Sequence, residues 1–149
     1  MNKNIEKYNM NDSYPLLMAT CSKLLRESLN NRFTKDGFKI TSEQWIILVH
    51  LWYQDGLSQQ TIADRYERSK VAAFRLIGRL EEQGFVVRQS DPVDGRCKRI
   101  FLTSKGRKVI QSLIPLANKN KDQAISGISD GDLNIFKRVL KKIIKNINN

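Results

Sequence analysis

The sequence predicts a mainly α-helical fold with a small β-hairpin, and three observations support this prediction. Apolar residues recur at three- and four-residue spacings, the period of a helix face, through most of the 149-residue chain. Hydroxyl and glycine residues stand where the helices would begin and end. Between residues 85 and 102, the pattern changes to strand-like segments around a loop rich in turn formers. A chain of this length fits one domain, residues 1–149, and can bury a core without a metal or a disulfide.

Two helices are predicted in the N-terminal third of the chain. From residue 13 to about residue 33, apolar side chains recur at helical spacing, and Asp36-Gly37 would end this first helix. A hydroxyl at residue 41 or 42 can cap the second helix, because a side-chain oxygen there accepts a hydrogen bond from a free N–H group. Residues 45–52 are unusually apolar, so we expect the second helix to be buried from several sides.

A short helix, a turn and a longer helix follow. Asp55-Gly56 turns the chain, and Ser58 can cap a helix that runs to Tyr66. The next helix runs from about Ser69 to Gln83 and has one apolar face and one cationic face. The cationic side chains are Lys70, Arg75 and Arg79.

A β-hairpin is predicted directly after this helix. Gly84 favours the helix end, because glycine adopts a positive φ at little steric cost. Residues 85–88 and 98–102 have the strand pattern, and residues 91–96 supply the turn. Arg96 therefore lies near the hairpin tip. A helix-turn-helix followed by such a hairpin is a winged helix-turn-helix.

Two more helices are predicted after the hairpin. The first extends from residue 107 to about residue 127 and contains Pro115, which removes one hydrogen bond, so we expect a bend or break near residues 112–114. Ser129 can begin the last helix. The apolar stripes of the first and last helices exceed what one domain of this size can cover, so we expect a partner chain there. The alternative for the last helix, which also carries five basic residues, is binding to a membrane surface.

The charge of the chain indicates a polyanionic partner. The formal net charge is +11 and the pI is near 9.9. Residues 65–108 hold twelve basic and five acidic side chains, so +7 of the +11 lies in less than a third of the chain. This concentration favours a nucleic-acid surface over a diffuse solubilising charge.

Several classes of protein are disfavoured by what the sequence lacks. It contains no run of 18 apolar residues, and its N-terminal residues lack the apolar segment of a signal peptide, so we expect a cytoplasmic protein. One histidine and no cysteine pair at ligand spacing argue against a zinc site. No catalytic triad, phosphate-binding glycine loop or carboxylate pair occurs in a recognisable setting. We therefore predict neither an enzyme nor a cofactor.

Three segments taken together resemble the MarR family of bacterial winged-helix transcriptional regulators. They are Arg75–Glu81, Asp91–Arg96 and Leu102–Arg107, in the order and spacing of the family. The resemblance covers nearly the whole chain and implies a single MarR-like domain. It implies that residues from about 38 to 105 form a DNA-binding winged helix-turn-helix, and that residues of about 12–34 and 106–147 form the helices of a homodimer.

The resemblance further implies sequence-specific binding to double-stranded DNA at an inverted-repeat operator, with repression as the commoner outcome. The alternative is a non-specific architectural or RNA-binding winged-helix protein. This alternative is favoured by residues 71–74, which are apolar where relatives usually carry hydroxyl groups that can hydrogen-bond to bases.

The DNA contacts follow from the usual docking of a winged helix-turn-helix, in which the second helix enters the major groove and the wing reaches the minor groove. We predict that Arg96 enters the minor groove, that Asp94 holds the Arg96 guanidinium, and that Val71 can touch thymine methyl groups. The other predicted DNA contacts are Gln59, Gln60, Ser69, Lys70, Arg75 and Lys98.

Four residues near these contacts have more ordinary interpretations. Arg79 lies close to two glutamates and is interpreted as an ion-pair partner. Phe74 is interpreted as a core residue. Arg88 and Lys98 could equally be solvent-exposed charges on the strands.

The resemblance also implies regulation by a small aromatic or phenolic ligand, which would bind between the dimerisation helices and the winged helix and weaken DNA binding. The candidate pocket residues are Trp45, His50, Trp52 and Tyr53. The alternative is that these side chains belong to the core, as aromatic residues at helical spacing usually do.

Either cysteine is a candidate redox site, because some members of the resembling family sense peroxides through a cysteine near the N-terminus. We favour Cys97, which lies between Arg96 and Lys98 and is expected to be exposed, since neighbouring cations favour the reactive thiolate. Cys21 is interpreted as an inert thiol on an apolar helix face.

Overall fold

The computed structural model describes residues 12–66 and 69–148, and within these ranges the chain is mainly helical with one three-stranded antiparallel sheet. The predicted fold class is confirmed. The helices are α1 (Tyr14–Lys35), α2 (Ser42–Tyr53), α3 (Gln59–Arg65), α4 (Lys70–Glu82), α5 (Ser104–Ala124) and α6 (Asp130–Ile147). The strands are β1 (Leu57–Ser58), β2 (Val86–Ser90) and β3 (Lys98–Leu102), in the order β1-β3-β2.

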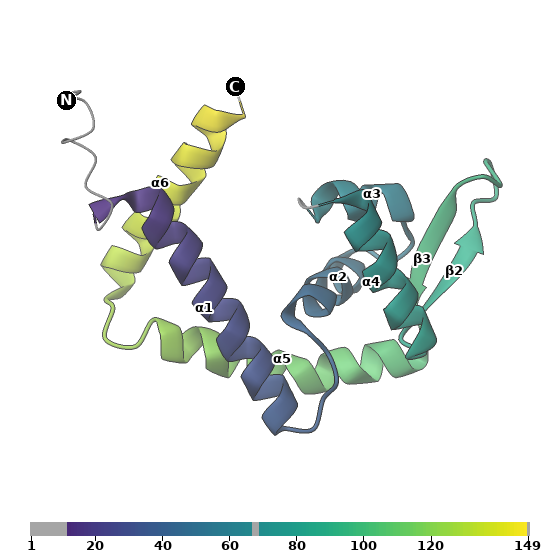
Figure 1. Cartoon of the computed structure of the whole chain (residues 1–149), viewed down its shortest axis with the longest axis horizontal. Helices are drawn as coiled ribbons and strands as arrows, with labels where there is room; N and C mark the ends of the chain where they lie inside the picture. Colours follow the sequence, from purple (N-terminus) through teal and green to yellow (C-terminus); the bar gives the residue numbers. More distant parts are fainter. Residues whose placement is uncertain (1–11, 67–68, 149) are drawn as a thin grey trace, which may run out of the picture.

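The elements form two groups joined by α5 (Figure 1). Helices α2, α3 and α4 and the β2–β3 hairpin gather at one end of the molecule, and α1 and α6 lie toward the other. Helix α5 runs along both groups. The helix-turn-helix and the wing are therefore built as one body, and α5 connects that body to the terminal helices.

Side-chain caps begin the helices of the first group. Thr41 Oγ1 accepts from the Gln44 N–H, and the Gln44 side chain accepts from the Thr41 N–H, so the cap of α2 is residue 41 and not residue 42. Ser58 caps α3, as predicted, and Ser69 caps α4 at the predicted start of that helix. The beginnings of all three helices are thus determined by local sequence.

The second helix of the motif, α4, buries one face as its spacing predicts. The buried residues are Ala73, Leu76, Ile77 and Leu80. Gly84 follows the helix with a φ of 77°, which confirms that glycine ends it.

The hairpin forms where the sequence predicts it, and a third strand joins it. Strands β2 and β3 pair antiparallel, and β3 has the predicted bounds of 98–102. The short strand β1 pairs with β3 through Leu57 and Ile100 and was not predicted. A strand of two residues is too short for an alternating pattern, so nothing in its own sequence distinguishes it from a loop.

Helix α5 continues across Pro115, so of the predicted bend or break the break does not occur. It begins at Ser104, because Thr103, one of the hydroxyl residues expected to cap this helix, accepts from the Gly106 N–H. Buried side chains lie on both sides of Pro115, namely Leu113 and Asn120. Packing on both sides holds the helix together although the proline cannot donate a hydrogen bond.

The core lies mainly in the winged-helix group. Phe33 from α1 and Ile110 and Leu113 from α5 complete it, whereas α6 contributes no buried residue. Gly106 marks the closest approach of α5 to the sheet, because a Cβ there would lie 2.0 Å from the Phe85 carbonyl oxygen. Among the residues that the structure describes, no helix has an apolar stretch long enough to span a bilayer.

Candidate nucleic-acid interface

The outer face of α4 is the main candidate surface for DNA. Val71 and Arg75 lie opposite the buried face, and the Val71 side chain is 78% exposed. Lys70, Arg75 and Arg79 are exposed and form no ion pair with any other residue in the described ranges. Their charges are therefore available to an external anion.

Two interpretations of residues on α4 are wrong. Arg79 is not an ion-pair partner of Glu81, because Glu81 pairs with Arg88 of β2 instead. Phe74 is not a core residue, because 36% of its surface remains exposed at the edge between the buried and outer faces. The outer face therefore has one more free cation and one more apolar group than the sequence predicts.

Ser69 is exposed at the start of α4, where its hydroxyl is already used. Ser69 Oγ accepts from the Ala72 N–H at 3.0 Å and so caps the helix. The hydroxyl keeps its own hydrogen as a donor, so a DNA acceptor can still bind to it.

The turn of the wing is organised by Asp91. Its Oδ1 accepts from the backbone N–H of Val93 at 2.8 Å and of Asp94 at 3.1 Å, and its Oδ2 pairs with Arg99 Nε. These contacts stabilise the carboxylate, so the N–H groups of Asp94 and Val93, followed by Arg99, hold the pKa of Asp91 below its usual value. The wing turn is thus fixed from within the protein.

Arg96 is exposed on this turn, close to the fully exposed side chain of Val93. The prediction that Asp94 holds the Arg96 guanidinium is wrong, because Asp94 Oδ1 instead accepts from the Arg96 backbone N–H at 3.0 Å. A carboxylate two residues away is well placed to close such a local turn. The guanidinium has no partner within the described residues and can reach outward.

The base of the wing is tied to the start of α5. Asp55 Oδ1 accepts from the Leu102 N–H at 2.9 Å, and its Oδ2 pairs with Arg107 Nη2 of α5. Arg99 Nη1 donates to the Gly56 carbonyl oxygen at 3.0 Å. These contacts join residues 43, 47 and 52 positions apart in the sequence, so no local spacing predicts them.

Three other predicted contact residues hydrogen-bond within the protein. Gln59 Oε1 accepts from Arg88 Nε at 2.9 Å, and Gln60 Nε2 donates to Asp64 at 2.7 Å. Lys98 Nζ donates to Ser90 Oγ at 2.8 Å across the hairpin. Each keeps at least one further donor for a phosphate, but none has a fully free side chain.

The predicted ligand residues do not all line one pocket. Trp45, Trp52 and Tyr53 line a cavity of about 250 Å³ between α2 and α5, with Ile110 and Ile114 on the α5 side. His50 does not line it. Burial, followed by the charge of Arg65, lowers the pKa of His50 below its usual value, so its imidazole is held neutral at pH 7.

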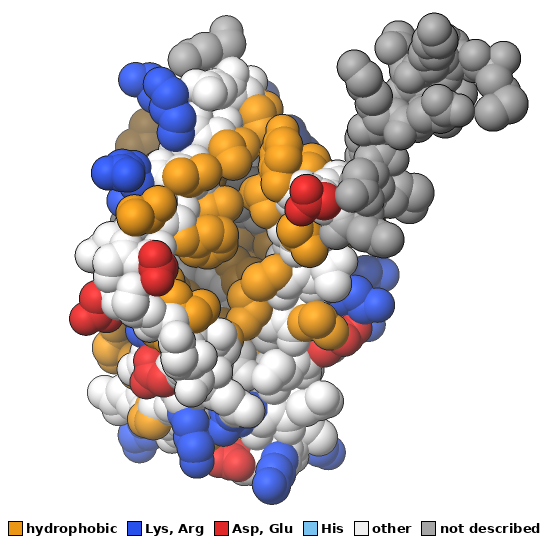
Figure 2. All heavy atoms as spheres, turned by 90° about the vertical axis from the view of Figure 1, so that its left-hand side faces the viewer, with side chains coloured by type: hydrophobic (Ala, Val, Ile, Leu, Met, Phe, Trp, Pro, Cys, Tyr) orange, Lys and Arg blue, Asp and Glu red, His pale blue; other side chains and the backbone are white. Residues whose placement is uncertain are grey.

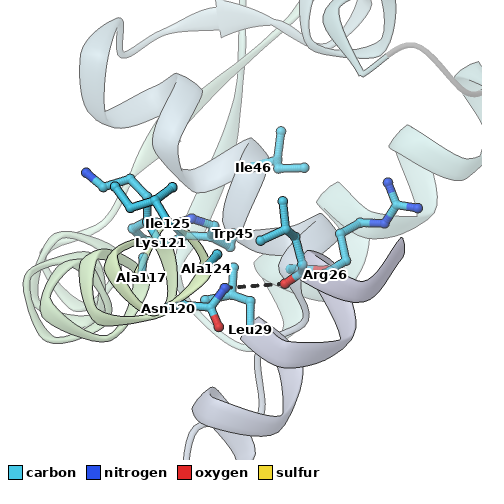
Figure 3. A pocket seen from close by; sticks show the side chains of 11 residues that line it. Arg26, Leu29, Trp45, Ile46, Ala117, Asn120, Lys121, Ala124 and Ile125 are labelled. Carbon is cyan, nitrogen blue, oxygen red and sulfur yellow. Dashed lines mark hydrogen bonds between the residues drawn. The ribbon is translucent and has the colours of Figure 1, made fainter. Parts of the chain in front are cut away.

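A neighbouring cavity of about 290 Å³ lies where α1, α2 and α5 meet (Figure 3). Its walls are largely apolar, with Leu29 from α1 and Trp45 from α2, while Arg26 and Lys121 are the cations that line it. Asn120 is buried and donates to the Leu25 carbonyl oxygen at 3.4 Å. The charged ends of Arg26 and Lys121 point away from the cavity (Figure 3), so its apolar walls suit a small, mainly apolar ligand.

Both cysteines are free thiols, and their exposure differs from the prediction. Cys97 is only half-buried rather than exposed, and its backbone is hydrogen-bonded at both ends of the wing turn, to Asp94 O and from the Asp91 N–H. Cys21 is exposed on α1. The wing thiol is therefore a poorer target for an oxidant than its sequence position indicates.

A family model for the MarR family matches residues 40–98, the segment that runs from α2 into the wing. Over these residues the chain matches the MarR family. The regulator YybA of Bacillus subtilis, an uncharacterised HTH-type transcriptional regulator, is 29% identical over 121 residues, which are 81% of this chain and 80% of YybA.

Two solved structures share the fold of this chain. The S. aureus MepR–DNA complex superposes with a TM-score of 0.80 at 24% identity and covers 93% of this chain and 99% of its own. Bordetella bronchiseptica BpsR, whose DNA binding is regulated by 6-hydroxynicotinic acid, gives a TM-score of 0.82 at 19% identity and covers 91% and 96%. MarR-family proteins are transcriptional regulators, which confirms that the chain is a DNA-binding regulator and not an enzyme.

Proposed function

We propose that the protein is a homodimeric repressor that binds an inverted-repeat operator in double-stranded DNA. The observation that carries this proposal is the set of unpaired cations on two DNA-facing elements, Arg75 on α4 and Arg96 on the wing. Both elements are held in place from within the protein, so their cations can meet the DNA in a fixed geometry. A chromosomal target places such a repressor in the cytoplasm.

The dimer would form through α1, α5 and α6. Figure 2 shows apolar side chains gathered around a hollow on the face that α1 and α6 present. Leu24 of α1 and Phe136 of α6 keep more than half of their surface exposed in the single chain. A monomer rarely exposes a continuous apolar patch of this kind, which supports a second copy over the membrane-surface alternative.

The operator contacts divide into two kinds. Arg75, at the centre of the outer face, and Val71, one turn before it, would face base edges in the major groove, with Val71 against a thymine methyl group. Arg96 would enter the minor groove. Lys70, Gln59, Gln60, Ser69 and Lys98 would contact phosphates, and Asp94 would contribute by shaping the turn.

The first test is selection from a pool of random duplexes at near-physiological salt, followed by sequencing of the retained DNA. We expect an inverted repeat with half-sites about 10 base pairs apart, one helical turn. Arg75→Ala and Arg96→Ala should each weaken binding to the enriched duplex, by roughly tenfold for a lost bidentate or minor-groove contact. Lys142→Ala, which removes a cation from α6 instead, should leave operator affinity nearly unchanged and is the matched control.

Other outcomes favour other functions. Retention of DNA without enrichment indicates a non-specific architectural protein, since only the salt-dependent phosphate interaction would remain. Preferential retention of RNA in a parallel pool indicates an RNA-binding protein. No retention at low salt contradicts DNA binding altogether.

Release of the operator by a small aromatic acid in the α1–α2–α5 cavity completes the proposal. The similar fold of BpsR, whose DNA binding responds to 6-hydroxynicotinic acid, supports this compound as the first probe. We expect it to weaken binding to the enriched duplex, and Arg26→Met to change that effect because the Arg26 side chain lines the cavity. An unchanged operator affinity at millimolar probe would contradict this choice of ligand class.

A further inference from the structure

Arg88, the middle residue of β2, contacts both helices of the helix-turn-helix at once. Its Nε donates to Gln59 Oε1 of α3 at 2.9 Å, and its Nη1 pairs with the Glu81 carboxylate of α4. Its backbone N–H donates to the second Glu81 oxygen at 3.2 Å. Its Nη2 lies 3.5 Å from the carbonyl oxygen of Phe74, also on α4. One side chain thus joins α3, α4 and the wing.

The surroundings of Arg88 differ from those of a phosphate-binding arginine. The side chain is only 29% exposed, and Glu81 neutralises its charge. The guanidinium passes close to Gly78, where an added Cβ would lie 3.8 Å from Nη2. Arg79, in contrast, is exposed and unpaired among the described residues. Arg79 therefore presents an unpaired charge to the DNA, whereas the charge of Arg88 is already paired within the protein.

The contacts of Arg88 are directional, whereas those beneath α4 are not. The buried face of α4 packs through aliphatic side chains, and apolar burial has little preference for one exact orientation. A guanidinium presents donors in a fixed plane, so it holds several acceptors in one relative geometry. Base reading needs such precision, because side chains must meet base edges within about 0.5 Å.

We propose that Arg88 is a positioning residue for base recognition. Through Gln59 and Glu81 it fixes the orientation of α4 relative to α3 and the wing, and this fixed orientation is what separates operator from random DNA. Arg88 itself does not contact the DNA. The proposal rests on the proposed operator-binding function and assigns discrimination within it to a residue outside the contact surface.

Glu81→Gln distinguishes this role from direct DNA contact, because the two roles predict opposite signs. If Arg88 positions α4, loss of the charged partner loosens the contact, and affinity for the enriched duplex falls by about tenfold. If Arg88 binds a phosphate, Glu81→Gln frees its charge and removes a nearby negative charge, so affinity rises. A rise would overturn the proposal.

Arg88→Met and Arg79→Met form a matched pair, since each removes one arginine from the same region. Arg88→Met should reduce operator affinity by about tenfold and affinity for a random duplex by less than about twofold, with an unchanged salt slope because its charge is already paired. Arg79→Met should weaken both duplexes equally and lower the salt slope by about one. Equal losses on both duplexes for Arg88→Met would overturn the proposal.

Arg88→Lys tests the bridge itself. Lysine keeps the ion pair with Glu81 but cannot reach Gln59 and Phe74 with the same rigid group, so operator affinity should lie between those of wild type and Arg88→Met. Full recovery would show that charge alone is sufficient and would contradict the bridging role.

Thermal unfolding and the oligomeric state of each variant are measured first, so that a loss caused by unfolding is recognised. Glu81→Gln keeps the shape of the side chain and provides the sign test if Arg88→Met does not fold. Failure of the wild-type protein to distinguish the enriched duplex from random DNA would contradict the proposed function as well. Failure of the positioning role alone would appear only in the variants.

Discussion

The winged-helix group and the terminal helices use the same apolar periodicity with opposite results. Helices α2 and α4 bury their apolar faces inside the chain, with Leu48 and Ile77 fully inaccessible. Helix α6 has an equally regular stripe and no buried residue. A periodic stripe therefore indicates that a face needs a cover, whereas only the rest of the fold shows whether the same chain supplies it.

Ion pairs also distinguish the winged-helix group from α6. Ion pairs join different elements of the winged-helix group, as in Asp55–Arg107 and Glu81–Arg88. The basic side chains of α6 form no ion pair within the described residues. The single chain thus specifies the winged helix, whereas α6 is left for the proposed second copy to cover.

The largest expected effect is in the core of the winged helix. Leu48→Ala should destabilise the protein by about 2–5 kcal/mol, because it removes buried methyl groups and leaves a cavity. Urea unfolding at fixed protein concentration measures this loss. Val93→Ala, at the 95% exposed wing tip, is the control and should cost less than about 0.5 kcal/mol. Similar losses for both variants would contradict the assigned core.

A smaller effect is expected from shortening one side chain of α6. It should appear as a weaker dimer rather than as a lower free energy of unfolding. Phe136→Ala should weaken the dimer by about 2 kcal/mol, or roughly thirtyfold in the dissociation constant, as for an aromatic side chain central to an interface. Analytical ultracentrifugation over a concentration series measures it. Lys145→Ala, on the opposite side of the helix, should leave the constant unchanged. An unaltered dimer in Phe136→Ala would remove α6 from the interface.

The smallest effect is a pH dependence within the winged-helix group. The pKa of His50 is lower in the folded protein than in the unfolded chain, so the unfolded chain binds the proton more readily. Stability should be fully present above the unfolded pKa, near 6.5, and should decline as the pH falls below it. Unfolding curves from pH 8 to pH 5.5 measure the decline, and His50→Asn should flatten it. An equal decline in both proteins would assign it to other groups.

The sequence predicted the elements whose signals are local. The cap at Ser58, the start of α4 near Ser69, the glycine after α4 and the bounds of β3 all follow from neighbouring residues, and the structure confirms them. Pro115 predicted a bend or break because it removes a hydrogen bond of the helix. The helix nevertheless continues, because Leu113 and Asn120 are buried on either side of the proline, and this packing depends on the whole fold. Local chemistry is thus a good guide to where an element begins and a weaker one to whether it continues.

In the candidate site, the sequence identified the residue types but not their partners. Arg96 and Asp94 were correctly placed in the wing turn, yet the contact between them uses the backbone. Arg88 was interpreted as a surface charge because its partner Gln59 lies 29 positions away, beyond any spacing rule. Ion pairs between distant segments depend on the folded arrangement, and so their discovery required the structure.

The Asp55–Arg107 contact has a mechanical consequence. Because Asp55 also accepts from the Leu102 N–H, one carboxylate binds both the first turn of α5 and the base of the wing, so the two tilt together. A helix of 21 residues is roughly 30 Å long, so a tilt of about 5° displaces its far end by about 2–3 Å. A small rotation of α5 at the base of the wing is thus converted into a larger displacement of its other end, which lies among the terminal helices.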